Sequence, residues 1–159
     1  MNLRDVALEV ARILEDVGKH AYQDQLNPRD MASMMVLGDP NQSDSAFGDK
    51  LVRFIENRLT YINTFQGFWR NRPDDCKTGD RFWCVGNIDG AINFNRDMAE
   101  WTLTVSLFEF NDQGSARPVL GVVHAPALGL TYLAAKGQGA IRIRKTPNGE
   151  KREKITPST

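Results

Sequence analysis

The feature that most constrains this fold is a run of alternating segments in the second half of the chain. Between Trp101 and Leu107 every second residue is apolar, and Thr102, Thr104 and Ser106 lie between them. A period of two is typical of a strand with one buried face. Further short β-type segments follow, separated by turns rich in Gly, Pro and Asn. The expected strands are 81–85, 101–110, 119–124, 130–135 and 140–144, with a last short one near Lys154–Ile155.

The first half of the chain has helical periodicity instead. Over residues 3–17 apolar side chains recur every three or four positions, which indicates an amphipathic helix that ends in the polar stretch 18–30. A second helix is expected to begin at Ser43 or Asp44, because either side chain can cap it, and 60–68 is predicted as a strand. Helices followed by a run of strands predict an α+β fold. Two helices would cover one face of a meandering, mostly antiparallel sheet.

Composition excludes several classes of protein. Twenty basic residues balance twenty acidic ones, so there is no electrostatic reason to expect nucleic acid or an anionic membrane as a partner. No apolar run approaches the roughly 20 residues of a membrane span. Charged residues in the first ten positions replace the apolar core of a signal peptide, and we expect a cytoplasmic protein. Cys76 and Cys84 are too few for a disulfide framework, and Cys84 is expected to be an inert core thiol.

One segment carries a specific motif. Residues 83–94 read WCVGNIDGAINF. This segment resembles the signature W-x-[IV]-D-P-[IL]-D-G-T-x-N-F of the inositol monophosphatase family, which includes 3'-phosphoadenosine 5'-phosphate phosphatases. Segments that look like the family's following strands and hairpin occur in the same order at 101–107, 118–126 and 132–140. Residues 1–159 therefore resemble a single N-terminal domain of the sugar-phosphatase fold, with no counterpart of the family's C-terminal α/β half.

The resemblance implies a Mg²⁺-dependent phosphatase site. Family members hydrolyse phosphate monoesters with Mg²⁺ ions, which neutralise charge and activate the attacking water. At the matching positions, Asp89 and the carbonyl of Ile88 would be metal ligands. The backbone N–H groups of Gly90 and Ala91 would contact the phosphate. Asp44 matches an aspartate that positions the attacking water, and its alternative role is that of a helix cap.

Several positions depart from the family pattern. The first signature Asp is Gly86 here, the signature Pro is Asn87, and the signature Thr is Ala91. The family's pair of Glu ligands would fall near 64–70, where the sequence TFQGFWR has no carboxylate. The acidic pair at 74–75 either compensates for this loss or is part of a solvated loop. The carboxylates that remain predict weak Mg²⁺ binding at best.

Three interpretations remain open from the sequence. In the first, the chain is a degenerate, truncated family member without useful phosphatase activity. It would act as a binding or regulatory module, paired with itself or with a partner protein that covers the missing half. In the second, it is a Mg²⁺-dependent phosphomonoesterase completed by a partner chain. Its substrate would be a phosphorylated small molecule, 3'-phosphoadenosine 5'-phosphate or an inositol phosphate, and its site would combine Asp44, Asp89 and Asp74 or Asp75. In the third, the sequence is an incomplete gene product.

Overall fold

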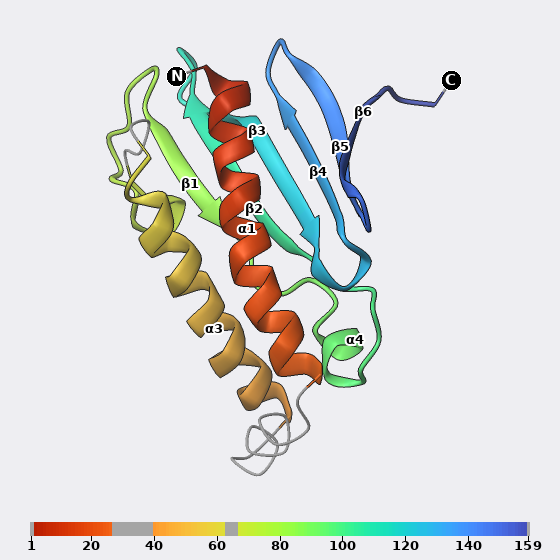
Figure 1. Cartoon of the computed structure of the whole chain (residues 1–159). Coiled ribbons are helices and arrows are strands. Elements are labelled where there is room, and N and C mark those ends of the chain that lie inside the picture. Colours follow the sequence, from red (N-terminus) through yellow and green to blue (C-terminus); the bar gives the residue numbers. More distant parts are fainter. Residues whose placement is uncertain (1, 27–39, 63–66, 159) are drawn as a thin grey trace.

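In the part of the chain that the structure describes, two long helices lie on one face of a six-stranded sheet (Figure 1). The computed structural model describes residues 2–26, 40–62 and 67–158, and residues 40–47 by their backbone alone. All strand pairs are antiparallel and join neighbours in the sequence, in the order β1-β2-β3-β4-β5-β6. The predicted α+β class, with two helices over a meandering sheet, is confirmed.

The strands agree closely with the alternation in the sequence. Their bounds are Arg81–Val85 (β1), Leu103–Phe110 (β2), Ala116–Ala125 (β3), Leu130–Ala135 (β4), Gly139–Thr146 (β5) and Gly149–Ile155 (β6). The strand predicted over 60–68 is wrong at its described ends, residues 60–62 and 67–68. Residues 60–62 form a turn after the second helix, and only Phe68 makes an isolated parallel bridge, to Trp83. Residues 63–66 of that segment lie outside the described part.

Both helices differ from their predicted bounds. The first helix, α1, spans Leu3–Leu26 and continues through much of the stretch expected to be a polar break. It continues because Ala21 and Gln25 extend its buried face, while the polar residues between them face solvent. The second, α3, spans Pro40–Leu59, so it begins before Ser43 and Asp44. Proline is well suited to the first turn of a helix. The prediction that Asp44 caps this helix is therefore wrong.

The core lies between α1 and the sheet. The buried apolar residues of α1 are Val6, Ala7, Val10, Ala11, Ile13, Leu14, Val17 and Ala21. They share one cluster with the alternating residues of the strands, among them Leu103, Val105 and Leu107. Full burial of one such side chain contributes roughly 1.5–3 kcal/mol, so this interface dominates the stability of the fold. α3 joins the same cluster through Leu51, Ile55 and Leu59.

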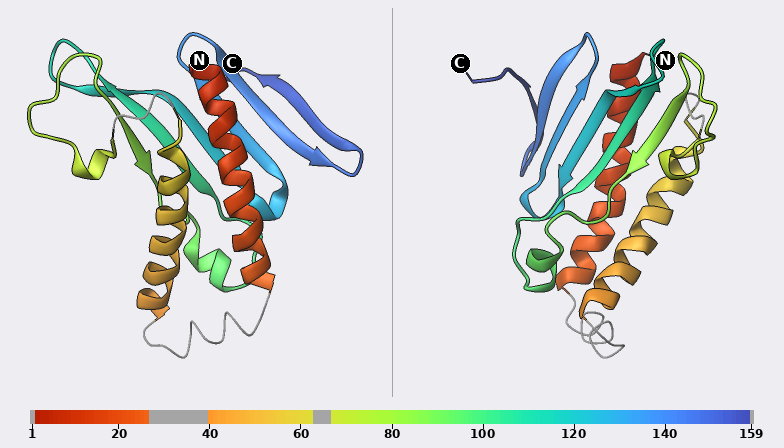
Figure 2. Two further views of the ribbon diagram at one scale, coloured as in Figure 1. Left: turned by 60° about the vertical axis from the view of Figure 1, so that its left-hand side comes forward. Right: turned by 180° about the vertical axis from the view of Figure 1, so that it is seen from behind.

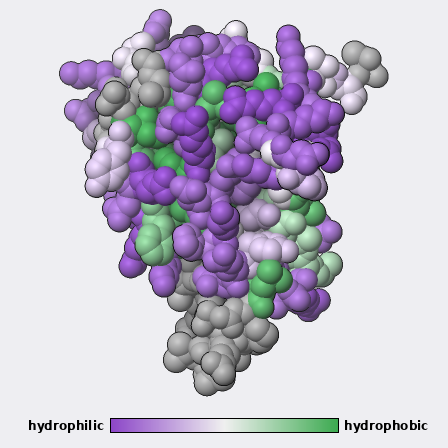
Figure 3. All heavy atoms as spheres, viewed as in Figure 1, coloured by the Kyte–Doolittle hydropathy of each residue, from purple (hydrophilic) through white to green (hydrophobic). Residues whose placement is uncertain are grey.

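The outer side of the helical layer is largely hydrophilic, with hydrophobic atoms showing only in patches (Figure 3). Within residues 2–26, 40–62 and 67–158, no helix combines the length and apolarity needed to cross a membrane.

Among the described elements, no long helix lies on the opposite face of the sheet (Figure 2, right). Five small residues occupy consecutive cross-strand positions there, from β1 to β5. We call them the small-residue row: Cys84, Ser106, Gly121, Ala134 and Ala140. The expectation that Cys84 is a core thiol is wrong, because the buried side chain of Trp83 faces the helices and the next residue of the strand faces away.

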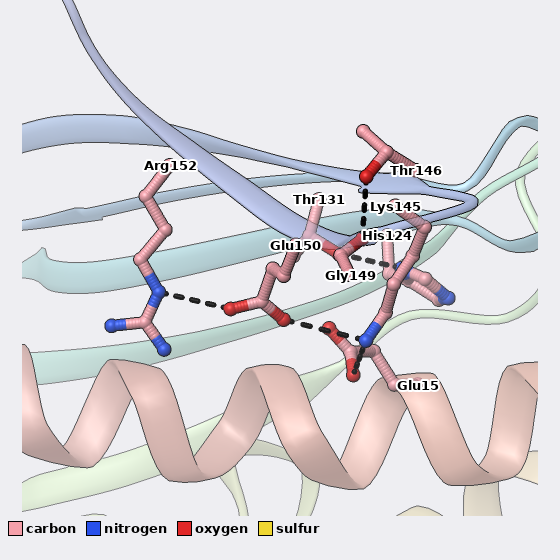
Figure 4. Close-up of polar contacts among 8 residues, drawn as sticks. All are labelled: Glu15, His124, Thr131, Lys145, Thr146, Gly149, Glu150 and Arg152. Atoms are coloured by element: carbon pink, nitrogen blue, oxygen red, sulfur yellow. Dashed lines mark hydrogen bonds and ion pairs between the residues drawn. The ribbon is translucent and has the colours of Figure 1, made fainter.

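A buried histidine lies where α1 crosses the sheet. His124 on β3 is 5% exposed, and its Nδ1 lies 2.7 Å from the Thr131 hydroxyl oxygen. Gly18 of α1 packs on its ring so closely that a Cβ there would lie 2.9 Å from Cδ2. Figure 4 shows this region together with the ion pairs that Lys145 forms with Glu15 of α1 and with Glu150, both at 3.3 Å. These partly exposed pairs add little to stability, and the missing side chain at Gly18 lets the helix come close to His124.

We expect the free energy of unfolding to decrease as the pH falls from about 6.5 towards 4. Burial lowers the pKa of His124 from 6.5 to about 4, and the nearby charge of Lys145 acts in the same direction. The unfolded chain binds a proton in this range and the folded chain does not, so protonation favours unfolding. The contribution of His124 is fully present above the unfolded pKa. It should have decreased by about 2 kcal/mol at about pH 4.5.

Urea unfolding of the wild type and of His124→Gln at about pH 7 and 4.5 measures this contribution. The variant should lose less stability between the two pH values than the wild type does. His20→Gln replaces the other histidine, which is exposed, and should behave like the wild type. Equal pH dependence in His124→Gln and the wild type would contradict the assignment.

Candidate functional site

The signature segment, residues 83–94, connects β1 to the short helix α4 at one end of the sheet. β1 contributes the buried Trp83, and α4 spans Ala91–Asn95. Between them the loop is held by an isolated antiparallel bridge. The N–H of Asp89 donates to the carbonyl of Thr102 at 3.0 Å, and the N–H of Thr102 donates back at 2.9 Å. The Asp89 side chain is exposed and Ile88 is half-buried.

Gly90 is required by the path of the backbone into α4. Its φ of 87° lies in the left-handed region. A Cβ at this position would also come within 2.6 Å of the Glu100 carbonyl oxygen. Gly90 is the N-cap of α4 and Ala91 is its first residue, so their N–H groups belong to the free amino end of that helix. The phosphate contact that the resemblance assigns to these two residues stays a prediction.

Gln25, near the end of α1, forms hydrogen bonds with α4 and with the residues that follow it. Its side chain is 6% exposed. Its amide nitrogen donates to the carbonyls of Phe94 at 3.1 Å and Met98 at 2.9 Å, and its amide oxygen accepts from the Trp101 indole at 3.0 Å. Gln25 was not predicted as a buried residue, because its side chain is polar. Its position four residues after Ala21, on the buried face of α1, was the available signal.

α3 approaches the same loop from the other side. A Cβ at Gly48 would lie 3.1 Å from the side-chain oxygen of Asn87, so the helix backbone comes close to the loop here. Position 44 is one helical turn earlier, on the same face of α3. Its side chain lies outside the described part, and its role in positioning water stays a prediction.

The residues that the structure describes do not by themselves fit the Mg²⁺ group that the resemblance implies. At Gly86, where the family has its first signature Asp, a Cβ would lie well within 3.0 Å of the Thr104 hydroxyl oxygen. In this structure, that hydroxyl oxygen lies against the place where the Cβ of an aspartate would be. Over residues 2–26, 48–62 and 67–158, no three His, Cys, Asp or Glu side chains lie close enough to hold a metal ion. Asp74 and Asp75 are exposed in the loop before β1.

The stretch 64–70, which was expected to match the family's two Glu ligands, ends with the basic residue Arg70. Arg70, in the 3-10 turn η1 (Trp69–Asn71), donates to the Oε2 atom of Glu56 at 2.7 Å. Glu56 lies on α3 and is 6% exposed. The pair neutralises a buried carboxylate of the helical layer. The sequence analysis did not identify Glu56, and no pattern in the sequence connects it with Arg70.

The α+β fold and the signature segment are those expected for a phosphatase-like domain, and comparison with known proteins identifies the family. The chain belongs to the inositol monophosphatase family, which residues 41–158 match. The resemblance seen in the sequence is confirmed. A histidinol-phosphatase of Streptomyces coelicolor is 28% identical over 138 residues, which are 86% of this chain and 50% of that protein. A 3'(2'),5'-bisphosphate nucleotidase CysQ of Salmonella typhimurium is 43% identical over 58 residues, which are 36% of this chain and 22% of that protein.

Solved structures show the same fold. CysQ from Bacteroides thetaiotaomicron, a bacterial member of the family, superimposes with a TM-score of 0.66 at 20% identity, over 97% of this chain and 54% of that one. The extragenic suppressor protein SuhB from Bartonella henselae gives a TM-score of 0.61 at 18% identity, over 87% and 51%. The chain therefore spans about half the length, or less, of these relatives.

Gly86→Ala is expected to destabilise the protein by roughly 1–3 kcal/mol, because the new methyl group meets the Thr104 hydroxyl. The backbone at Gly86 is not left-handed, so the steric contact alone carries the cost. Combining Gly86→Ala with Thr104→Ala should recover most of the loss, with a coupling of about 1–2 kcal/mol in a double-mutant cycle.

Gly121→Ala is the matched control on the same face. Its Cβ would lie 3.9 Å from the Ser106 hydroxyl oxygen, an ordinary contact, so this variant should retain the stability of the wild type. Urea unfolding of all four variants measures these effects. Additive effects of Gly86→Ala and Thr104→Ala would show that Thr104 does not fill the space beside Gly86.

Proposed function

We propose that this domain is a binding or regulatory module of the inositol monophosphatase family and lacks useful phosphatase activity. The observation that carries the proposal is the packing of the Thr104 hydroxyl against Gly86, the position where the family has a metal-binding carboxylate. Asn87 beside it offers a neutral amide, which is a poorer ligand for Mg²⁺ than a carboxylate. Asp89 is the carboxylate of the signature that remains.

The chemistry of phosphate ester hydrolysis explains why this loss is severe. A bound Mg²⁺ pair would neutralise the dianionic phosphate and lower the pKa of the attacking water. Mg²⁺ requires near-octahedral oxygen ligands, and carboxylates commonly anchor it. Where the family has its two Glu ligands, the described residues include Arg70, which forms an ion pair with Glu56. This ion pair does not provide two carboxylates for a metal.

A binding role is supported by the open face of the sheet. The small-residue row carries no long side chain across five strands, and Val123 and Tyr132 beside it are 39% and 37% exposed. The helical side, in contrast, is largely hydrophilic (Figure 3). We propose that a second copy of the chain covers the open face, since apolar surfaces of this kind mark sites of protein association.

The chain is expected to release no more phosphate than its Asp89→Asn variant does. The substrates to test with Mg²⁺ are 3'-phosphoadenosine 5'-phosphate, inositol 1-phosphate and histidinol phosphate, the first two from the family resemblance and the third from the name of a relative. An active relative assayed in parallel shows that the conditions support turnover. Phosphate release that Asp89→Asn abolishes would overturn the proposal and favour a Mg²⁺-dependent phosphomonoesterase.

Light scattering after size-exclusion chromatography is expected to give a mass at least twice the 17.9 kDa of one chain. Ala134→Arg places a long cation in the small-residue row and should return the protein to a monomer. Gln23→Arg, on the exposed side of α1, is the control and should leave the mass unchanged. A monomeric wild type, or an oligomer that Ala134→Arg leaves intact, would contradict the second-copy proposal.

A further inference from the structure

A small cavity, partly open to solvent, lies between α3, η1 and β1, beside the first residues of the signature segment. Its volume is about 100 Å³. Its walls come from three segments: Val52 and Glu56 of α3, Phe68–Arg70, and Trp83–Val85. Most of these side chains are apolar or aromatic, so any polar atom that reaches the cavity requires a hydrogen-bond partner there.

Two of the residues that line this cavity each carry a buried polar atom without such a partner among the residues that the structure describes. One is the Oε1 atom of Glu56, whose other oxygen accepts from Arg70, and the second is the indole nitrogen of Trp83. Glu56 is 6% exposed and Trp83 is 1% exposed. Leaving either atom unsatisfied would cost roughly 1–3 kcal/mol, and more for the charged group.

The two atoms are complementary in kind. The indole N–H can only donate a hydrogen bond, and the carboxylate oxygen can only accept one. A water molecule satisfies both, because it accepts from one partner and donates to the other. An anion such as phosphate is repelled by the Glu56 carboxylate. A cation would meet the positive hydrogen of the indole and the guanidinium of Arg70.

We propose that an ordered water bridges Trp83 Nε1 and Glu56 Oε1 and joins α3 to β1. The cavity has room for a water, which needs only about 10–15 Å³ of space accessible to its centre. Glu56 lies eight residues, a little more than two helical turns, after Gly48, where α3 meets Asn87. The bridge therefore helps to hold α3 beside the signature segment. The proposal does not depend on whether the domain is catalytic.

The test is the magnetisation exchange between water and the indole protons in the ¹⁵N-labelled protein. The Trp83 indole proton should show direct cross-relaxation with water, with the sign typical of a water bound for longer than the tumbling time of the protein. Trp101 is an internal control, since it is 1% exposed and donates directly to Gln25. Its indole proton should show no such cross-peak.

Glu56→Leu removes the acceptor and should abolish the water cross-peak of Trp83 while leaving Trp101 unchanged. Glu9→Leu, at an exposed end of an i,i+3 pair on α1, is a control for removing a glutamate and should retain the peak. The wild-type spectrum alone decides the matter if Glu56→Leu fails to fold. A Trp83 cross-peak no stronger than that of Trp101 would overturn the proposal and indicate a dry cavity.

Discussion

The packing of α1 across the middle of the sheet is the interaction on which the rest of the structure depends. α1 contributes eight buried apolar residues to the core, and the sheet presents an alternating buried face to it. Gly18 allows α1 to contact His124, and Gln25 fixes the end of α1 to α4 and Trp101. Through these contacts one helix packs against the buried face of the sheet and helps to position the signature segment.

Much of the fold could be predicted from the sequence because its dominant signal is local. The alternation from Trp101 to Leu107 gives β2, and regular turns give the later strands. The bounds of α1 and α3 were harder to predict. Polar residues on the exposed side of a helix resemble those of a loop, so the continuation of α1 beyond residue 17 depends on the single buried residues Ala21 and Gln25. Propensity alone does not show which face will be covered.

The candidate site was only partly visible in the sequence. The family signature located the loop with Asp89, Gly90 and Ala91, and the comparison with known proteins confirmed the family. Two decisive contacts join residues distant in the sequence: Gly86 with Thr104, and Glu56 with Arg70. Neither has a periodic signal. The sequence shows that position 86 lacks a carboxylate. It does not show that the Thr104 hydroxyl lies against Gly86 in the fold.

The small-residue row also has a consequence for the entropy of association. Glycine and alanine lose no rotamer freedom when they are covered, and serine and cysteine lose little, whereas lysine or glutamate loses up to about 2 kcal/mol. Ordering this face therefore costs little conformational entropy. The charged outer strand β6, with its lysines and glutamates, has the opposite character. A partner would gain most of its binding free energy over the middle of the sheet and little at that edge.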